Sequence, residues 1–228
     1  MEYLIKHQEA LEFLKTLKDG SVNLVVTDPP YILSDCGYGG ICGKRRKYHN
    51  LYSKELKEFL RNGFDFKILQ EIRRVNNPLN AYFFCNTYLL AKLLEYFKND
   101  KIDILVYHKK NPIPTFNKKY LSDLEYILFV CNERNLMQNT FSTSSKLFSM
   151  NIPTKETLHP AEKPLCILKT LIQNSSQKGD VVLDCFLGSG STLKASLELD
   201  RKFLGCEIKK EYFNMALKRI KNLQKNLF

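Results

Sequence analysis

The chain has 228 residues, of which 44% are hydrophobic and 26% are charged, an ordinary composition for a globular domain. Its 35 Lys and Arg outnumber its 24 Asp and Glu, for a formal charge of +11. That balance favours a polyanionic partner over a merely basic surface. The longest apolar run, Tyr126–Cys131, is far shorter than the roughly 20 residues that span a bilayer. The composition argues against a membrane protein, a disordered chain and a secreted disulfide scaffold.

The seven cysteines are scattered, several of them in apolar runs where a free thiol packs as a small hydrophobe. Met1 leads straight into Glu2 with no secretory signal, so we expect a cytoplasmic protein with reduced thiols. Cys36, Cys42 and His49 share one stretch, but the two cysteines are spaced more widely than usual zinc ligands. No metal site is predicted.

Apolar β-rich runs alternate with helical patterns along the chain. Before residue 132 the pattern predicts strands at 3–5, 22–27, 81–85, 102–107 and 125–131, and helices at 10–17, 53–61, 66–75 and 87–98. After a polar stretch over 132–162, it predicts helices at 164–174, 192–199 and 210–225, and strands at 181–184 and 202–207. This alternation predicts one α/β domain over 1–228, with a mostly parallel sheet and helices on both faces.

The segment that begins at Val181 reads as a strand, a glycine turn and a helix start, an arrangement that lets a ligand approach the backbone. Glu207 follows 17 residues beyond Gly190, at the end of the next strand, where an acid can accept two ribose hydroxyls. A dinucleotide site prefers a small residue where Leu193 stands. Asp184 would repel a pyrophosphate but attract an ammonium group. The charge pattern therefore favours S-adenosylmethionine over NAD, and both over an ordinary βα corner.

The sequence Asp28-Pro29-Pro30-Tyr31 directly follows a strand of buried type, which places it at the edge of the sheet where ligands bind in such folds. An exocyclic amine of adenine or cytosine is a poor nucleophile, because its lone pair is delocalised into the ring. The Asp28 carboxylate and the Pro29 carbonyl could draw that nitrogen toward tetrahedral geometry. Pro30 fixes where this carbonyl points, and Tyr31 offers a ring on which an extruded base can stack.

At these residues the chain resembles the β group of amino-methylating DNA methyltransferases, the N4/N6 DNA methylase family. The similarity extends over Leu11–Tyr31, Arg74–Asn86, Lys110–Pro114, His159–Pro164 and Val181–Glu207. It implies a Rossmann-like methyltransferase fold that depends on S-adenosylmethionine. The motif order is circularly permuted, since the catalytic tetrapeptide precedes the cofactor motif.

The resemblance also implies which residues contact the cofactor. His159 and Lys163 are expected near the methionine carboxylate, and Glu9 replaces the family's acid beside the cofactor adenine. Cys185 stands where the family has a proline, which removes no catalytic group. The remaining cofactor contacts implied are Asp184, Phe186, Gly188, Gly190, Ser191 and Glu207.

Double-stranded DNA is the partner that both the charge and the resemblance imply. Cations interleaved with aromatic residues suit phosphate contact and base stacking, and two such groups occur. The DNA-binding candidates are Lys44, Arg45, Arg46, Lys47, Lys109, Lys110, Lys118 and Lys119. The chain is short for the family, so we expect recognition from loops at 32–52 and 109–160. A homodimer and a cognate restriction endonuclease both remain open.

In this family an Asp at the first motif position goes mostly with adenine N6, so Asp28 favours adenine over cytosine N4. Enzymes that methylate a guanine amine in RNA or a protein glutamine carry similar tetrapeptides, but usually after the cofactor turn. Here Asp28 comes 160 residues before Gly188. A catalytically silent nucleic-acid-binding protein would usually have lost the tetrapeptide or the strand-terminal acid, and both are intact.

Overall fold

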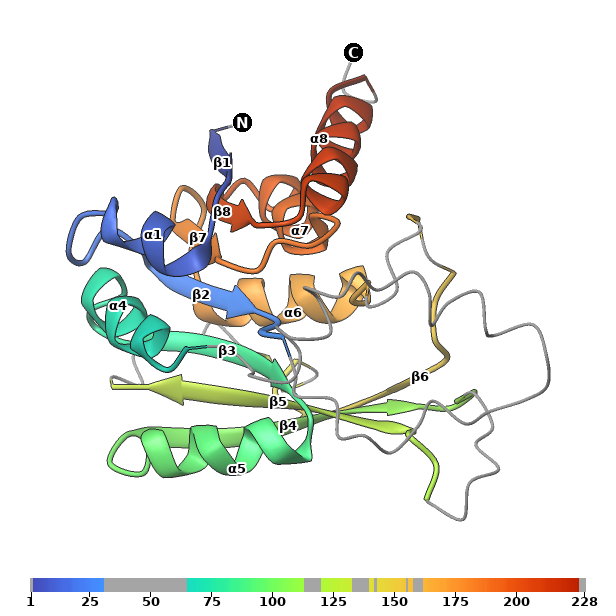
Figure 1. The fold of residues 1–228 in the computed structure, drawn as a ribbon. Coiled ribbons are helices and arrows are strands. Elements are labelled where there is room, and N and C mark those ends of the chain that lie inside the picture. Colours follow the sequence, from blue (N-terminus) through green and yellow to red (C-terminus); the bar gives the residue numbers. More distant parts are fainter. Residues whose placement is uncertain are drawn as a thin grey trace.

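The computed structural model describes residues 2–30, 65–112, 120–132, 140–141, 143–154, 156–157 and 162–225. In these segments eight strands form one sheet with the order β1-β8-β7-β2-β3-β5-β4-β6 (Figure 1). Only β5 runs against its neighbours, and the other pairs are parallel. The strands are β1 (Tyr3–His7), β2 (Leu24–Thr27), β3 (Asn80–Cys85), β4 (Lys101–Lys109), β5 (Leu124–Cys131), β6 (Leu147–Met150), β7 (Val181–Asp184) and β8 (Lys202–Glu207). The predicted, mostly parallel sheet is confirmed.

Helices cover both faces of this sheet, as predicted. One face packs against α1 (Ala10–Lys15), α4 (Lys67–Val75) and α5 (Thr87–Tyr96). The other packs against α6 (Leu165–Ser175), α7 (Ser191–Glu198) and α8 (Lys210–Lys225), which lie together on one side of the molecule (Figure 1). Among the described residues, no helix combines the length and apolar character needed to cross a membrane.

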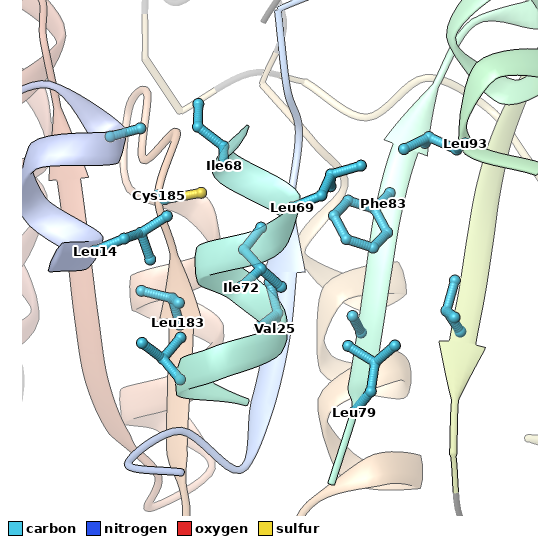
Figure 2. Packing of buried hydrophobic residues seen from close by; sticks show 14 of the residues in the cluster. Leu14, Val25, Ile68, Leu69, Ile72, Leu79, Phe83, Leu93, Leu183 and Cys185 are labelled. Carbon is cyan, nitrogen blue, oxygen red and sulfur yellow. The ribbon is translucent and has the colours of Figure 1, made fainter. Parts of the chain in front are cut away.

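Strand alternation divides the core into two layers. In β2, Val25 faces α1 and α4, whereas Leu24 and Val26 face α6 and α7, because successive strand side chains point to opposite faces. Figure 2 shows the first layer, in which α4 lies over the sheet with Leu69 and other apolar side chains against Phe83. Both faces of the central strands are therefore buried, which explains their continuous apolar runs.

The N-terminal and C-terminal parts of the chain pair with each other in one half of the sheet. β2 pairs in parallel with β7, and β1 pairs with β8 so that His7 lies opposite Glu207. The carboxyl ends of parallel strands share one edge of a sheet, so the segments that follow β1, β2, β7 and β8 are gathered there. The permuted order along the chain thus still yields neighbouring strand ends.

The structure adds one strand that the sequence did not predict. β6 lies in the stretch expected to be irregular, and it pairs only with β4 at the border of the sheet. β6 has only four residues, between Lys146 and Asn151, and three of them are apolar; so short a run gives a weak strand signal. The predicted helix at 53–61 lies outside the described residues.

Candidate active site

The glycine turn after β7 has a backbone conformation that requires glycine. Gly188 and Gly190 have φ of 53° and 79°, values that favour glycine over residues with a Cβ. A Cβ at Gly190 would lie 3.0 Å from the Cβ of Ala216 in α8. The turn therefore packs directly on α8, and α7 begins at Ser191 immediately after it.

Glu207 ends β8 and faces this turn. Its carboxylate oxygens each accept a backbone N–H at 2.8 Å, one from Gly188 and one from Lys209. Burial raises the pKa of Glu207 although both hydrogen bonds oppose the shift. The side chain is thus held at the turn, and a carboxylate oxygen has a second lone pair for a ligand hydroxyl. The next residue, Ile208, is an apolar side chain that is 51% exposed. The sequence analysis did not single it out, although an apolar residue directly after an acid at the end of a strand is visible in the sequence.

Asp184 at the end of β7 joins the glycine turn, which is the predicted cofactor turn, to β2, which leads into Asp28. Its Oδ1 accepts a hydrogen bond from the hydroxyl of Thr27 at 2.7 Å and another from the backbone N–H of Phe186 at 3.1 Å. Burial raises the pKa of Asp184 to about 6. Thr27 is the last residue of β2, so the residue after it, Asp28, lies beside the cofactor turn.

A row of four charges crosses the same edge of the sheet. Lys163 lies between Asp28 Oδ2, at 2.9 Å from Nζ, and Glu125 Oε1, with which it forms a closer ion pair. The other Glu125 oxygen is 3.2 Å from Lys109 Nζ. The Phe84 ring lies 5.1 Å from Lys163 Nζ, a cation–π distance. The order is Asp28, Lys163, Glu125, Lys109, with signs that alternate.

These contacts fix the ionisation of the central pair. Burial alone would lower the pKa of Lys163, but the carboxylates of Asp28 and Glu125 raise it above its usual value. Burial would raise the pKa of Glu125, but the two lysines lower it. Both groups are therefore charged at neutral pH. Sequence reasoning placed Lys163 near the cofactor carboxylate and did not foresee its contact with Asp28.

A second network joins the segment around Lys163 to α7 and α8. Glu162 accepts a hydrogen bond from Arg219 of α8 at 2.6 Å, and Arg219 also donates to the Ser191 hydroxyl at 2.9 Å. Glu162 also accepts hydrogen bonds from the backbone N–H and hydroxyl of Thr157. Glu162 and Arg219 are nearly buried. Sequence reasoning did not single out this pair, because nothing local indicates a contact between residues 57 positions apart.

Of the other predicted site residues, some lie in the described segments and the rest lie outside them. Pro29 is buried, Lys110 is exposed, and Glu9 caps α1 by accepting the backbone N–H of Glu12 at 3.0 Å. Glu9 follows β1 and so lies at the same edge as Glu207. The predicted residues outside the described segments are Tyr31, Lys44, Arg45, Arg46, Lys47, Lys118, Lys119 and His159.

A family model described as DNA methylase matches residues 22–218. The chain belongs to the DNA methylase family. It is 25% identical over 245 residues to the type II methyltransferase M2.DpnII of Streptococcus pneumoniae, covering 95% of this chain and 89% of that one. It is 47% identical over 62 residues to the DNA adenine methyltransferase YhdJ of Escherichia coli (strain K12), covering 27% of this chain and 21% of YhdJ.

The fold of this DNA methylase also matches solved structures. The crystal structure of an M1.HpyAVI–SAM complex superposes with a TM-score of 0.70 and 25% identity, over 95% of this chain and 99% of that one. The predicted family and Rossmann-like fold are confirmed. The methylase is an enzyme that methylates DNA with S-adenosylmethionine, as the motifs predicted.

Proposed function

We propose that this methylase transfers a methyl group from S-adenosylmethionine to the N6 amine of an adenine turned out of double-stranded DNA at a specific sequence. The observation that carries the proposal is the hydrogen bond of 2.7 Å between Thr27 and Asp184. It joins the ends of β2 and β7, so the catalytic Asp28 lies next to the cofactor turn. Reaction at these strand ends requires only that both ligands be held in line.

The described residues fit S-adenosylmethionine group by group. The buried Asp184 carboxylate suits the α-ammonium, since no lysine or arginine contacts it among the described hydrogen bonds and ion pairs. Glu207 is held to accept the ribose hydroxyls, and the exposed Ile208 offers an apolar surface for the adenine. Gly188 and Gly190 give the positive φ that the turn beside Glu207 requires. When bound, the cofactor supplies an electrophilic methyl group on a sulfonium.

Asp28 and the Pro29 carbonyl prepare the nucleophile in this proposal. Both accept hydrogen bonds from the amine, which directs the nitrogen lone pair toward the methyl carbon. As the N–C bond forms, the C–S electron pair goes to sulfur and the nitrogen becomes cationic; it then releases one N–H proton to solvent. Lys163 is charged and contacts Asp28, which orients the catalytic carboxylate.

Adenine is favoured over cytosine by two observations. Asp28 occupies the first motif position, where the family mostly has Asp for adenine. The 62-residue match at 47% identity is to a protein named as a DNA adenine methyltransferase. Cytosine N4 is the second candidate, because the amine chemistry at Asp28 is the same for both bases.

Recognition of the DNA site is proposed for the loops at 32–52 and 109–160. Their cations Lys44–Lys47, Lys110, Lys118 and Lys119 are proposed to contact phosphates. Lys109 pairs with Glu125, so its ammonium group would contact a phosphate and Glu125 at the same time. M2.DpnII is named as a type II methyltransferase, which supports a role beside a cognate restriction endonuclease.

The test is transfer of a tritiated methyl group from S-adenosylmethionine to duplex DNA, RNA and protein, followed by mass spectrometry of the labelled nucleosides. We expect N6-methyladenine in DNA. Asp28→Ala should abolish transfer, a loss of at least about 1,000-fold, while cofactor affinity by calorimetry stays within about threefold of wild type. Label only in RNA or protein would refute the substrate class, and N4-methylcytosine would favour the second candidate. Wild-type turnover by Asp28→Ala would refute the role of Asp28.

A further inference from the structure

Among the described residues, Glu125 is a mostly buried carboxylate at the catalytic edge that the proposed function does not use. It is the second residue of β5, its side chain is 14% exposed, and it bridges Lys163 and Lys109 with one oxygen each. Because β3 separates β5 from β2 in the sheet, Glu125 cannot replace Asp28 at the amine. Its effect on the reaction must pass through Lys163.

The balance of charge shows what Glu125 can contribute. Asp28 with Lys163 alone is neutral, and adding Glu125 makes the inner group of three negative by one charge. Lys109 balances that charge from the far side of Glu125, at 3.2 Å and with 23% of its side chain exposed. The amine nitrogen becomes cationic as it takes the methyl group, so a negative inner group stabilises the transition state more than the ground state.

Glu125 also shares the ammonium group of Lys163 with Asp28. The lysine is closer to Glu125 than to Asp28, and the side chains of all three are mostly buried. Without the charge of Glu125, the ammonium group of Lys163 would pair with Asp28 alone. A carboxylate that already accepts strong hydrogen bonds from an ammonium group accepts weaker ones from the amine of the base. The two effects act in the same direction.

We propose that Glu125 is a positioning residue for methyl transfer: it holds Lys163 between two carboxylates and supplies the negative charge that supports the cationic amine at Asp28. This inference rests on the proposed function, because it requires Asp28 to bind the amine.

The experiment compares Glu125→Gln, Glu125→Asp and wild type under saturating DNA and S-adenosylmethionine. Glu125→Gln keeps the shape and removes the charge, so kcat should fall about 30-fold, the effect of one charge at about 8 Å and an effective dielectric constant of about 20. Cofactor affinity by calorimetry should stay within about twofold, because no described contact joins Glu125 to Asp184, Gly188 or Glu207, to which the proposed function assigns the cofactor. Glu125→Asp keeps the charge and should retain kcat within about threefold.

Asp100→Asn is the matched control. Asp100 is also a mostly buried carboxylate in an ion pair, with Arg73, but it lies at the opposite end of the sheet, just before β4. This variant should lower the melting temperature and leave kcat unchanged. A variant that melts near the assay temperature is compared with wild type and the control at a temperature below its melting point.

Two results would overturn the inference while the proposed function stands. One is an active wild type with a Glu125→Gln kcat within about twofold of it. The other is an equal loss in Glu125→Gln and Glu125→Asp, which would indicate a role in packing alone. A wild-type enzyme that transfers no methyl group to adenine in DNA would instead refute the proposed function, and the inference with it.

Discussion

Acidification should weaken cofactor binding through Asp184. This carboxyl group is buried, and burial raises its pKa to about 6. In the proposed complex it lies beside the α-ammonium of S-adenosylmethionine, and an opposite charge stabilises the ionised form. Binding therefore requires Asp184 to release the proton that it holds at low pH in the free enzyme.

The size of the effect follows from the two pKa values. If the ammonium returns the pKa of Asp184 to about 4, its ordinary range, then at pH 5 about nine in ten free molecules are protonated and the bound ones mostly are not. The dissociation constant should therefore rise about tenfold between pH 8 and pH 5. The raised pKa of Glu207 acts in the same direction.

The raised pKa of Asp184 also predicts how the folding stability of the free enzyme depends on pH: stability should increase on acidification, whereas cofactor affinity decreases. A carboxyl group whose folded pKa lies above its unfolded value binds more protons in the folded state, so its contribution to stability decreases as pH rises from about 4 to about 6. For Asp184 alone, the free enzyme gains stability on acidification through this window. The complex should lack this gain.

The assay is calorimetric titration with S-adenosylmethionine from pH 8 to pH 5. Asp184→Asn should bind more weakly at pH 8 and lose most of the pH dependence. Methylthioadenosine lacks the ammonium group, so its dissociation constant should change with pH only through Glu207, and therefore less steeply. An affinity of wild type that does not change with pH, or one that Asp184→Asn leaves equally pH-dependent, would refute the assignment of the ammonium to Asp184.

Three further predictions follow from the same edge of the sheet. Glu207→Ala should raise the cofactor dissociation constant at least about tenfold by removing the acceptor of two ribose hydroxyls, and an unchanged constant would exclude that role. Gly190→Ala should lower the unfolding free energy by about 2 kcal/mol in urea titration. The reasons are the φ of 79° at this position and the distance of 3.0 Å from the new Cβ to the Cβ of Ala216. A variant as stable as wild type would contradict this packing. Replacing the four cations of Lys44–Lys47 by Gln should weaken DNA binding at all sequences and flatten its salt dependence, whereas an unchanged slope would place that loop away from the phosphates.

The sequence predicted those parts of the site that local chemistry encodes. Asp184 and Glu207 each end a buried strand and Asp28 directly follows one, and an acid at the end of a strand is visible from the residues alone. Their gathering at one edge followed from the alternation of strands and helices, and the pairing of β2 with β7 confirms it.

What the sequence could not predict were contacts between distant residues. Lys163, just before α6, meets Asp28 after β2 and Glu125 in β5, and Arg219 reaches Glu162 from α8. None of these pairs has a local pattern, since each depends on how whole elements pack. β6 was missed for the same reason, because its four residues form a strand only beside β4.

The most direct test of the central claim is to map methylated bases in genomic DNA from cells that express either wild-type enzyme or Asp28→Ala. The account predicts N6-methyladenine at one recurring sequence with wild type and none above background with the variant. Methylated adenine at the same sites in both cultures, or no new methylated base with wild type, would contradict it.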